Sequence, residues 1–316
     1  MHETNKIVGD ALIPSYTKQQ VLEATLKYFK EDSLATNVWI DKYCLKDLQG
    51  NYLELTPNDM HKRLAREFAR IELKYPNPLS YEDIYNLLKN FNFILPGGSI
   101  LYGCENSYSI SSLGNCFVIG NNSDSYGGIC TTDQELCQLF KRRSGVGHDI
   151  SHLRPDKTPT SNAAGYGTGP VSFMSRFSHT ARETAQSGRR GAQMITIDIN
   201  HPDIQQFIIC KDDLSQITGA NISVKITDEF MKAVENDKEF DLEFTKDLGY
   251  GAIYSKPNPI FGQTIEWWTE EKTDHLVKSN YKIRYSKITV KAKPLWDKLI
   301  HQAWKSAEPK LWDLVA

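Results

Sequence analysis

The chain has 316 residues, which is enough for one large domain or two of ordinary size. An apolar fraction of 40% and a net charge of -2 are typical of a soluble globular protein and exclude one that coats nucleic acid. No apolar run approaches the length of a membrane span, and the first residues lack the pattern of a signal peptide. We therefore expect a cytoplasmic protein without membrane association.

Residues 1–92 are expected to form a helical domain. Thr17, Thr56 and Ser80 each precede a helical pattern and can cap it. The apolar faces of these helices are expected to be Leu22, Leu26 and Phe29, then Met60, Leu64, Phe68 and Ile71, then Ile84, Leu87 and Leu88. The outer faces are charged and carry no site-like cluster, so this domain is interpreted as a packing layer.

From residue 93 the pattern changes to alternating short strands and helices, which favours an α/β fold with parallel strands. Strands are expected at 117–119, 194–199 and 221–226. Thr132-x-x-Glu135 predicts the start of one helix, which ends near Gly145. Three further helices are expected. The first buries Met174, Phe177 and Ala181, the second begins at Pro202, and the third is capped by Thr227.

Residues 246–291 have weak periodicity and several turn signals, which indicates a surface insertion. A last helix follows and ends at 307–309. Its predicted inward face is Trp296, Leu299, Ile300, Ala303 and Trp304.

Six scattered cysteines without a Cys-x-x-Cys pair exclude a disulfide scaffold and a structural zinc site. Most of them are expected to be small buried hydrophobes. Cys116 follows Asn115 and a flexible stretch at the start of an apolar strand, so it is either a redox thiol on an open cleft or a core cysteine.

Three glycine-rich segments, 144–147, 162–169 and 187–191, can let the backbone approach a ligand. Arginines adjoin two of them and can pair with phosphate, although neither segment has the spacing of a Walker loop. Together they predict a nucleotide site. Ser99, in Pro96-Gly97-Gly98-Ser99, can also hold an anion. His148 and His152 are four residues apart, but no zinc-protease glutamate accompanies them.

The order of these segments resembles the large catalytic subunit of ribonucleotide reductase, and most closely its adenosylcobalamin-dependent class. The resemblance covers nearly the whole chain and rests on segments 37–47, 96–99, 115–118, 125–129, 141–149, 153–155, 188–192, 200–203 and 221–226. It implies an α/β fold in which a helical domain, 1–92, precedes the first half of a ten-stranded α/β barrel, 93–316. It also implies a ribonucleoside-diphosphate reductase, which makes 2′-deoxyribonucleotides by radical chemistry for DNA synthesis.

The resemblance implies two sites. On the substrate side, Cys116 matches the catalytic thiol that is oxidised to a disulfide, and Ser99 and Asn115 help to hold the ribonucleoside diphosphate. On the effector side, Asp124 lies near the ribose and Arg154 at the phosphates, while 162–169 and 187–192 are the two specificity loops. The implied effector-binding residues are Asp124, Arg154, Asn162, Gly165, Arg189 and Arg190.

The resemblance also implies adenosylcobalamin in the complete enzyme, no metal site, and ATP or deoxynucleoside triphosphates as effectors. A thioredoxin-type reductant and a second copy in a homodimer are the implied partners. The radical cysteine and the second redox cysteine of the family would follow residue 316. We therefore expect a C-terminal half-chain as a further partner and an inactive chain without it, whether the chain is a split subunit or a truncation.

A second interpretation is a non-catalytic module that binds nucleotide effectors or dimerises. Such a module would derive from the large subunit of the di-iron-dependent class, which shares most of these motifs.

Overall fold

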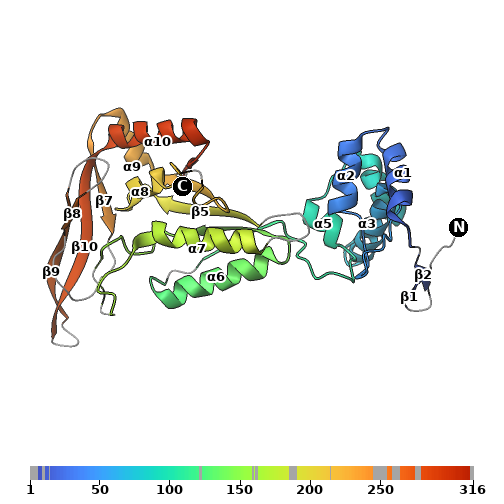
Figure 1. The fold of residues 1–316 in the computed structure, drawn as a ribbon, viewed down its shortest axis with the longest axis horizontal. Coiled ribbons are helices and arrows are strands. Elements are labelled where there is room, and N and C mark those ends of the chain that lie inside the picture. The colour runs from blue at the N-terminus through green and yellow to red at the C-terminus, as the bar shows by residue number, and fades with distance from the viewer. Residues whose placement is uncertain are drawn as a thin grey trace. The chain divides into compact units, whose positions relative to one another are not determined.

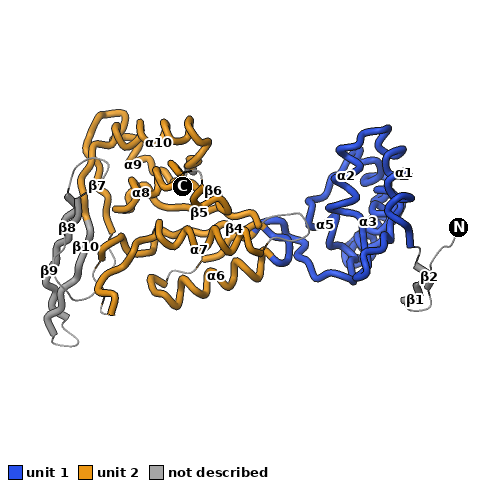
Figure 2. Tube along the Cα trace, viewed as in Figure 1, with its two compact units in different colours: residues 1–116, 141–144, 185–189 blue, residues 117–140, 145–184, 190–316 orange. Residues whose placement is uncertain are grey.

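The structure is a computed structural model that divides into two compact units (Figure 2). It describes the chain except residues 1–5, 9–10, 14, 121–122, 159, 161–162, 185–190, 214, 245–254, 258–263, 275–278 and 314–316, and except the side chains of 1–14, 245–286 and 312–316. The helical unit comprises 1–116, 141–144 and 185–189. The sheet unit comprises 117–140, 145–184 and 190–316.

The helical unit is built from short capped helices. They are α1 (Lys18–Tyr28), α2 (Ser33–Lys42), α3 (Pro57–Glu72), α4 (Tyr81–Leu88) and α5 (Gly98–Gly103), with a 3-10 turn at Lys89–Phe91 and a hairpin of β1 (Lys6–Val8) and β2 (Ala11–Ile13). Thr17, Thr56 and Ser80 form capping boxes at α1, α3 and α4, which confirms the predicted starts. The core centres on Met60, Leu64, Ile84 and Leu88, with Leu22, Phe29 and Phe68 packed around it.

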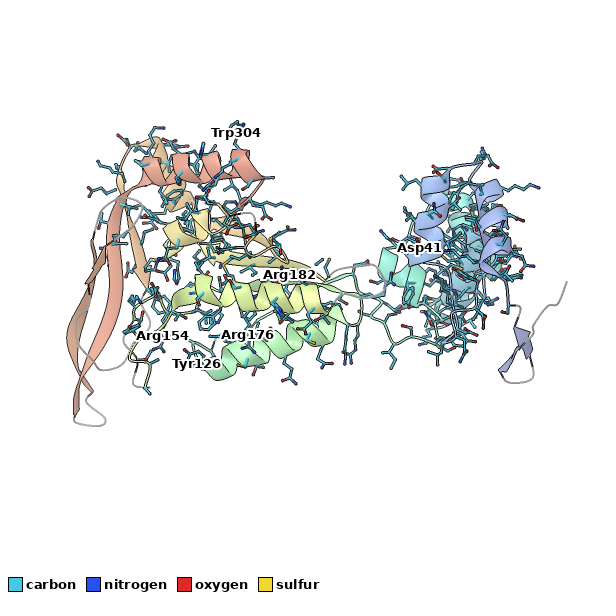
Figure 3. All side chains as sticks on the ribbon, viewed as in Figure 1. Asp41, Tyr126, Arg154, Arg176, Arg182 and Trp304 are labelled. Atoms are coloured by element: carbon cyan, nitrogen blue, oxygen red, sulfur yellow. The ribbon has the colours of Figure 1, made fainter. Side chains whose placement is uncertain are left out.

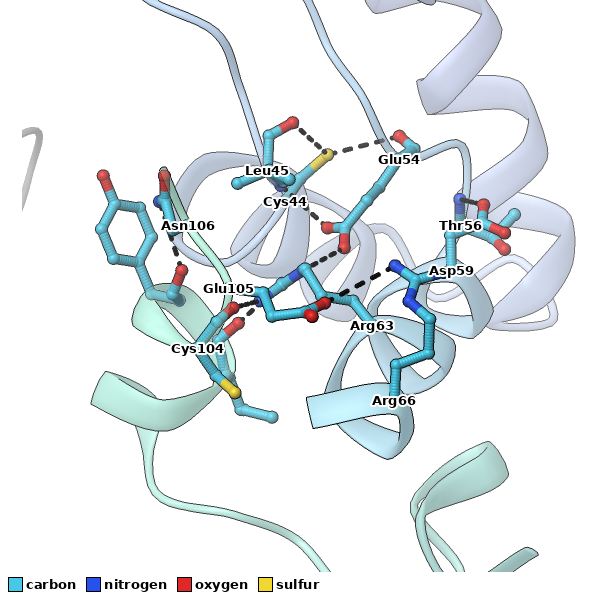
Figure 4. Close-up of polar contacts among 12 residues, drawn as sticks. Cys44, Leu45, Glu54, Thr56, Asp59, Arg63, Arg66, Cys104, Glu105 and Asn106 are labelled. Carbon is cyan, nitrogen blue, oxygen red and sulfur yellow. Dashed lines mark hydrogen bonds and ion pairs between the residues drawn. The ribbon is translucent and has the colours of Figure 1, made fainter. Parts of the chain in front are cut away.

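A buried ion pair ties α5 to α3 (Figure 4). Arg63 Nε donates to Glu54 Oε1 at 2.8 Å, and both side chains are 4% exposed. The guanidinium also donates to the carbonyls of Leu101 and Cys104, and the Leu45 amide donates to Glu54 Oε2 at 2.8 Å. Because the pair is surrounded by further hydrogen bonds, neither charge is left uncompensated in the interior. The α5 helix, which carries Ser99, is thereby fixed within the helical unit.

The sheet unit contains a five-stranded sheet in the order β11-β6-β5-β4-β3. Its central strand, β5, is labelled in Figure 1. The strands are β3 (Cys116–Ile119), β4 (Gly145–Asp149), β5 (Ala192–Asp198), β6 (Asn221–Ile226) and β11 (Lys310–Asp313). The β4–β5, β5–β6 and β6–β11 pairs are all parallel, with Gly145 opposite Ala192, Met194 opposite Asn221, and Lys310 opposite Ser223. Over the described residues the sheet stays open, with β3 and β11 as its outer strands.

One face of this sheet is buried against helices. Ile195 and Ile197 of β5, with Ile222 and Val224 of β6, are fully buried, as expected from the two-residue period of a strand. They pack in one core with α6 (Tyr126–Phe140), α7 (Gly169–Glu183), α8 (Ile204–Ile209), α9 (Asp228–Glu235) and α10 (Ala292–Ser306). The predicted α/β architecture, a helical part followed by parallel strands, is confirmed.

The predicted surface insertion is mostly strand. A four-stranded antiparallel sheet has the order β7-β10-β9-β8, from β7 (Glu239–Phe244), β8 (Ser255–Pro257), β9 (Thr264–Asp274) and β10 (Ser279–Lys291). Phe240, Leu242, Ile288 and Val290 join its β7–β10 end to the main core. The weak apolar periodicity of 246–291 concealed these strands.

Two predicted details are wrong. The α6 helix begins at Tyr126, where Ser125 Oγ accepts from the Gly128 amide at 3.1 Å, so Thr132 lies inside the helix. The glycine pair in that first turn disguised the start, because glycine disfavours helix. In α10 the buried positions are Ala292, Leu295, Leu299 and Gln302, whereas Trp304 is 81% exposed (Figure 3). Gln302 can be buried because its amide donates to Asp212 at 2.7 Å.

His148 makes the stability of the sheet unit depend on pH. Its ring lies on the helix-covered face, 4.8 Å from the Phe177 ring centroid, and neither ring nitrogen has a hydrogen-bond partner among the described residues. Burial lowers its pKa to about 4, against a smaller opposing effect of Asp149. Below its ordinary pKa of about 6.5 the unfolded chain takes up a proton that the folded chain does not.

We predict that lowering the pH from 8 to 5 reduces the free energy of unfolding by about 2 kcal/mol through His148 alone. His148→Leu should remove this component, measured by urea unfolding across that pH range. The control is His179→Ala, since the His179 side chain is 66% exposed on α7. An unchanged pH profile in His148→Leu would contradict the assignment.

Candidate functional site

The sheet unit contains a pocket of about 220 Å³ where the start of α6, the segment after β4 and the start of α7 meet. Asp124 and Arg154 supply its charge, Thr160 and Thr168 supply hydroxyls, and Tyr126, Leu153 and Phe173 supply apolar surface. Tyr126 and Arg154 lie toward the same end of the α6–α7 pair (Figure 3). The pocket thus combines an ion pair with an aromatic wall.

Asp124 and Arg154 form a close, multiply bonded pair. Arg154 Nε donates to Asp124 Oδ2 at 2.8 Å, its Nη2 to the Asp124 carbonyl at 3.3 Å, and its backbone amide to Asp124 Oδ1 at 3.0 Å. The side chains are 27% and 16% exposed. A guanidinium has five N–H donors, and its bonds to Asp124 use two. The arginine therefore keeps donors suited to phosphate oxygens, next to a carboxylate that can accept from a sugar hydroxyl.

The segment between Arg154 and α7 folds back on itself. The Lys157 amide donates to the Gly167 carbonyl at 2.9 Å, the Gly167 amide to the Thr158 carbonyl at 2.8 Å, and the Thr160 amide to the Gly165 carbonyl at 2.9 Å. Gly165 has φ +75°, a conformation that residues with a Cβ atom disfavour. The structure thus places Gly165 in a tight turn beside the pocket, whereas Asn162 lies outside the described residues.

Aromatic rings form the apolar wall. Tyr126 and Phe173 meet edge to face with their centroids 6.0 Å apart, and Tyr126 is 54% exposed. Outside the pocket lining, in the same loop, Lys157 lies over the Tyr166 ring at 4.6 Å from its centroid. An exposed ring beside a cationic group suits a planar base attached to phosphates.

The substrate-side residues Ser99, Asn115 and Cys116 belong to the helical unit. Asn115 Oδ1 accepts from the Ser99 amide at 2.9 Å, and a Cβ on Gly97 would come within 2.0 Å of Asn115 Nδ2. Cys116 is exposed, so it is not the core cysteine of the alternative interpretation. The Ser99 side chain is fully buried, and its hydroxyl donates to the Arg143 carbonyl at 3.4 Å. Asn115 therefore joins the turn before α5 to the exposed thiol.

The segment 141–147 does not form a phosphate loop. Arg143 is 7% exposed, its guanidinium carbon lies 3.8 Å from the Tyr102 ring centroid, and its Nη2 donates to the Lys42 carbonyl at 3.0 Å. Gly145 and Gly147 lie within β4, where they pair with β5 instead of forming a turn. The arginines of the other segment, Arg189 and Arg190, lie outside the described residues.

Sequence reasoning missed a charged cluster on the sheet face opposite the helices. Lys225 Nζ lies 2.9 Å from Asp149 Oδ2 and 2.7 Å from Asp198 Oδ1. Burial acts to raise the pKa of Asp149, but hydrogen bonds from Ser151 and Lys225 outweigh it and leave that pKa lowered. The three residues come from three strands, so only the register of the sheet reveals their proximity.

His201 and Asp203 were also missed as parts of the pocket's support. They follow β5 and are buried, at 2% exposure each, and both bond to the segment that carries Arg154. The His-Pro-Asp motif was noticed in the sequence but had no assigned role.

Within the described ranges, no group of three or more His, Cys, Asp or Glu side chains could hold a metal ion. The His148 ring is buried in the core beside Phe177, so it does not form a metal-binding pair with His152. Of the helices that the structure describes, none combines the length and apolarity needed to cross a bilayer.

Comparison with known families identifies the class of protein. Residues 114–312 match the barrel domain of ribonucleotide reductase, and residues 29–104 match its all-alpha domain. Because the first match alone covers more than half of the chain, the protein belongs to the ribonucleotide reductase family.

Among curated relatives, the chain is similar to vitamin B12-dependent ribonucleoside-diphosphate reductases. One from Thermoplasma acidophilum is 33% identical over 204 residues, which is 64% of this chain and 22% of that protein. One from Mycobacterium tuberculosis is 34% identical over 208 residues, 64% of this chain and 29% of that protein. The ribonucleoside-diphosphate reductase large subunit of Variola virus is 26% identical over 237 residues, 72% of this chain and 28% of that protein. The chain thus spans less than a third of each of these relatives.

We predict that Cys116 is among the fastest-reacting thiols of the native protein, because it is exposed at the start of β3. Cys104 is the matched slow control, since burial raises its pKa to about 11, and burial raises that of Cys210 to about 12. Timed alkylation followed by peptide mass spectrometry measures each rate. A Cys116 peptide labelled as slowly as the Cys104 peptide would refute the assignment of an accessible thiol.

Proposed function

We propose that the chain is the amino-terminal part of an adenosylcobalamin-dependent ribonucleoside-diphosphate reductase. The observation that carries this proposal is the Asp124–Arg154 pocket, which combines phosphate donors, a hydroxyl acceptor and an aromatic wall within a reductase barrel domain. Identity to the vitamin B12-dependent relatives is higher than to the Variola large subunit, which favours the cobalamin class.

In this proposal the two sites have separate tasks. The Asp124–Arg154 pocket binds an allosteric nucleotide, either ATP or a deoxynucleoside triphosphate, beside the turn at Gly165. Asn162, Arg189 and Arg190, which lie outside the described residues, are proposed as further effector-binding residues. Cys116 is the redox thiol. With a second thiol it gives up two hydrogens and forms a disulfide, while the ribose 2′-hydroxyl leaves as water and hydrogen replaces it. Asn115 and Ser99 order the backbone beside that thiol.

Adenosylcobalamin would supply the organic radical for the complete enzyme. Neither candidate site fits a corrin ring, because the pocket is only about 220 Å³ and carries an ion pair, and the surroundings of Ser99 are buried. The proposal therefore assigns no cobalamin contact to these residues. It includes ribonucleoside diphosphates as substrates, a thioredoxin-type reductant, and a second copy of the chain as partner.

Calorimetric titration with deoxynucleoside triphosphates tests the effector site. Arg154→Ala should remove charge-assisted hydrogen bonds of about 1.5–3 kcal/mol and so weaken binding by about 10- to 150-fold. Arg176→Ala is the matched control, since Arg176 pairs with Asp133 at the same 2.8 Å elsewhere in the sheet unit. Cys116→Ser should bind as the wild type does. Equal losses in the two arginine variants, or none in Arg154→Ala, would contradict the proposed effector site.

The cofactor class has its own test. Reductase activity of the complete enzyme should need adenosylcobalamin and no radical-generating small subunit. Activity that appears only with such a subunit would overturn the cobalamin assignment and favour a reductase of the di-iron-dependent class.

A further inference from the structure

We propose that His201 and Asp203 are positioning residues for the nucleotide pocket, because they hold both sides of the turn that presents Arg154. This inference rests on the proposed nucleotide function. It concerns residues that do not line the pocket themselves, since neither side chain is among those that surround it.

His201 fixes the residue before Arg154. The Asp203 amide lies 3.0 Å from His201 Nδ1, and His201 Nε2 lies 2.9 Å from the Leu153 carbonyl. A backbone N–H can only donate, so Nδ1 must accept, and a neutral ring then carries its proton on Nε2. Burial lowers the pKa of His201, which keeps the ring in that neutral form. The Nε2 proton therefore points at the Leu153 carbonyl.

Asp203 fixes the chain on the other side of Arg154. Its Oδ2 accepts from the Asp156 amide at 2.7 Å, and the residue is 2% exposed. Leu153 and Asp156 are thus bound to one short motif, with Arg154 and Pro155 between them. The contact with Asp124 is made by Arg154 itself, so it does not fix the backbone of Leu153 or Asp156 as the hydrogen bonds of His201 and Asp203 do.

The same carboxylate also lies against the far end of the loop. Gly169, at the start of α7, has φ +74°, and a Cβ there would come within 2.6 Å of Asp203 Oδ2 and 2.8 Å of the Asp156 nitrogen. The segment between β4 and α7 therefore contacts Asp203 at both of its ends. Glycine is required at 169 because its φ is positive and because a Cβ atom would collide with these neighbours.

The sheet places this motif where the turn can reach it. The Ile150 amide donates to the Thr196 carbonyl, and the His201 amide to the Asp198 carbonyl, at 3.0 and 3.1 Å. Because β4 and β5 are parallel, the segments that follow them emerge at the same edge. The anchor is thus built on the rigid end of β5.

The test compares Asp203→Ala with Asp203→Asn in the 316-residue chain, using dATP binding and hydrogen exchange at the Asp156 amide. Asp203→Ala should weaken binding at least tenfold, equivalent to about 1.4 kcal/mol, and speed exchange at Asp156. Asp203→Asn keeps an oxygen acceptor and should recover affinity to within about threefold. Gln205→Met, on the buried side of α8, is the control and should bind as the wild type does.

An unchanged affinity in folded Asp203→Ala, or an equal loss in Gln205→Met, would overturn the positioning role. If the wild type binds neither ATP nor any of the four deoxynucleoside triphosphates, the proposed function fails, and hydrogen exchange alone decides the positioning role. Faster exchange at the Asp156 amide in Asp203→Ala then supports that role, and unchanged exchange overturns it. If Asp203→Ala does not fold, the wild type still gives an answer. Its Asp156 amide must exchange as slowly as the β5 amides, and fast exchange there overturns the anchor.

Discussion

The parallel register of β4 against β5 is the constraint on which the sheet unit depends. It sets Val146 and His148 beside Gln193 and Ile195 on the helix-covered face, and a slip of one residue would turn Thr196 and Asp198 into the apolar core. It also brings together two loops that are about fifty residues apart in sequence. The turn at 153–156 and the motif at 201–203 meet only because both strands end at one edge.

Each candidate site is held by buried polar contacts behind it. In the helical unit, the Glu54–Arg63 pair binds the carbonyls at the end of α5, while Asn115 binds the amide of Ser99. In the sheet unit, His201 and Asp203 bind the turn of Arg154. Such contacts are costly to leave unpaired, so they specify one backbone arrangement. The exposed thiol of Cys116 and the half-buried guanidinium of Arg154 remain available for chemistry and binding.

Sequence patterns predicted the fold class, the capped helices of the helical unit and the strand at 221–226, because each depends on local periodicity or a capping side chain. They failed where tertiary packing decides. The glycines at 145 and 147 indicated a loop but lie in a buried strand, and Gln302 replaced Trp304 on the inner face of α10 because Asp212 satisfies its amide. Asp124 and Arg154 were found through resemblance, but their contact depends on tertiary packing. The Lys225 cluster and the contacts of Asp203 depend on the register of the parallel strands.

In the proposed function, the sheet unit binds a nucleotide between the start of α6 and the loop after β4. Hydrogen exchange of the wild-type chain, with and without a saturating deoxynucleoside triphosphate, tests it most directly. We expect added protection at 124–129 and 153–169, with little change in α10. Protection that is absent at those segments, or that appears only in the helical unit, would contradict it.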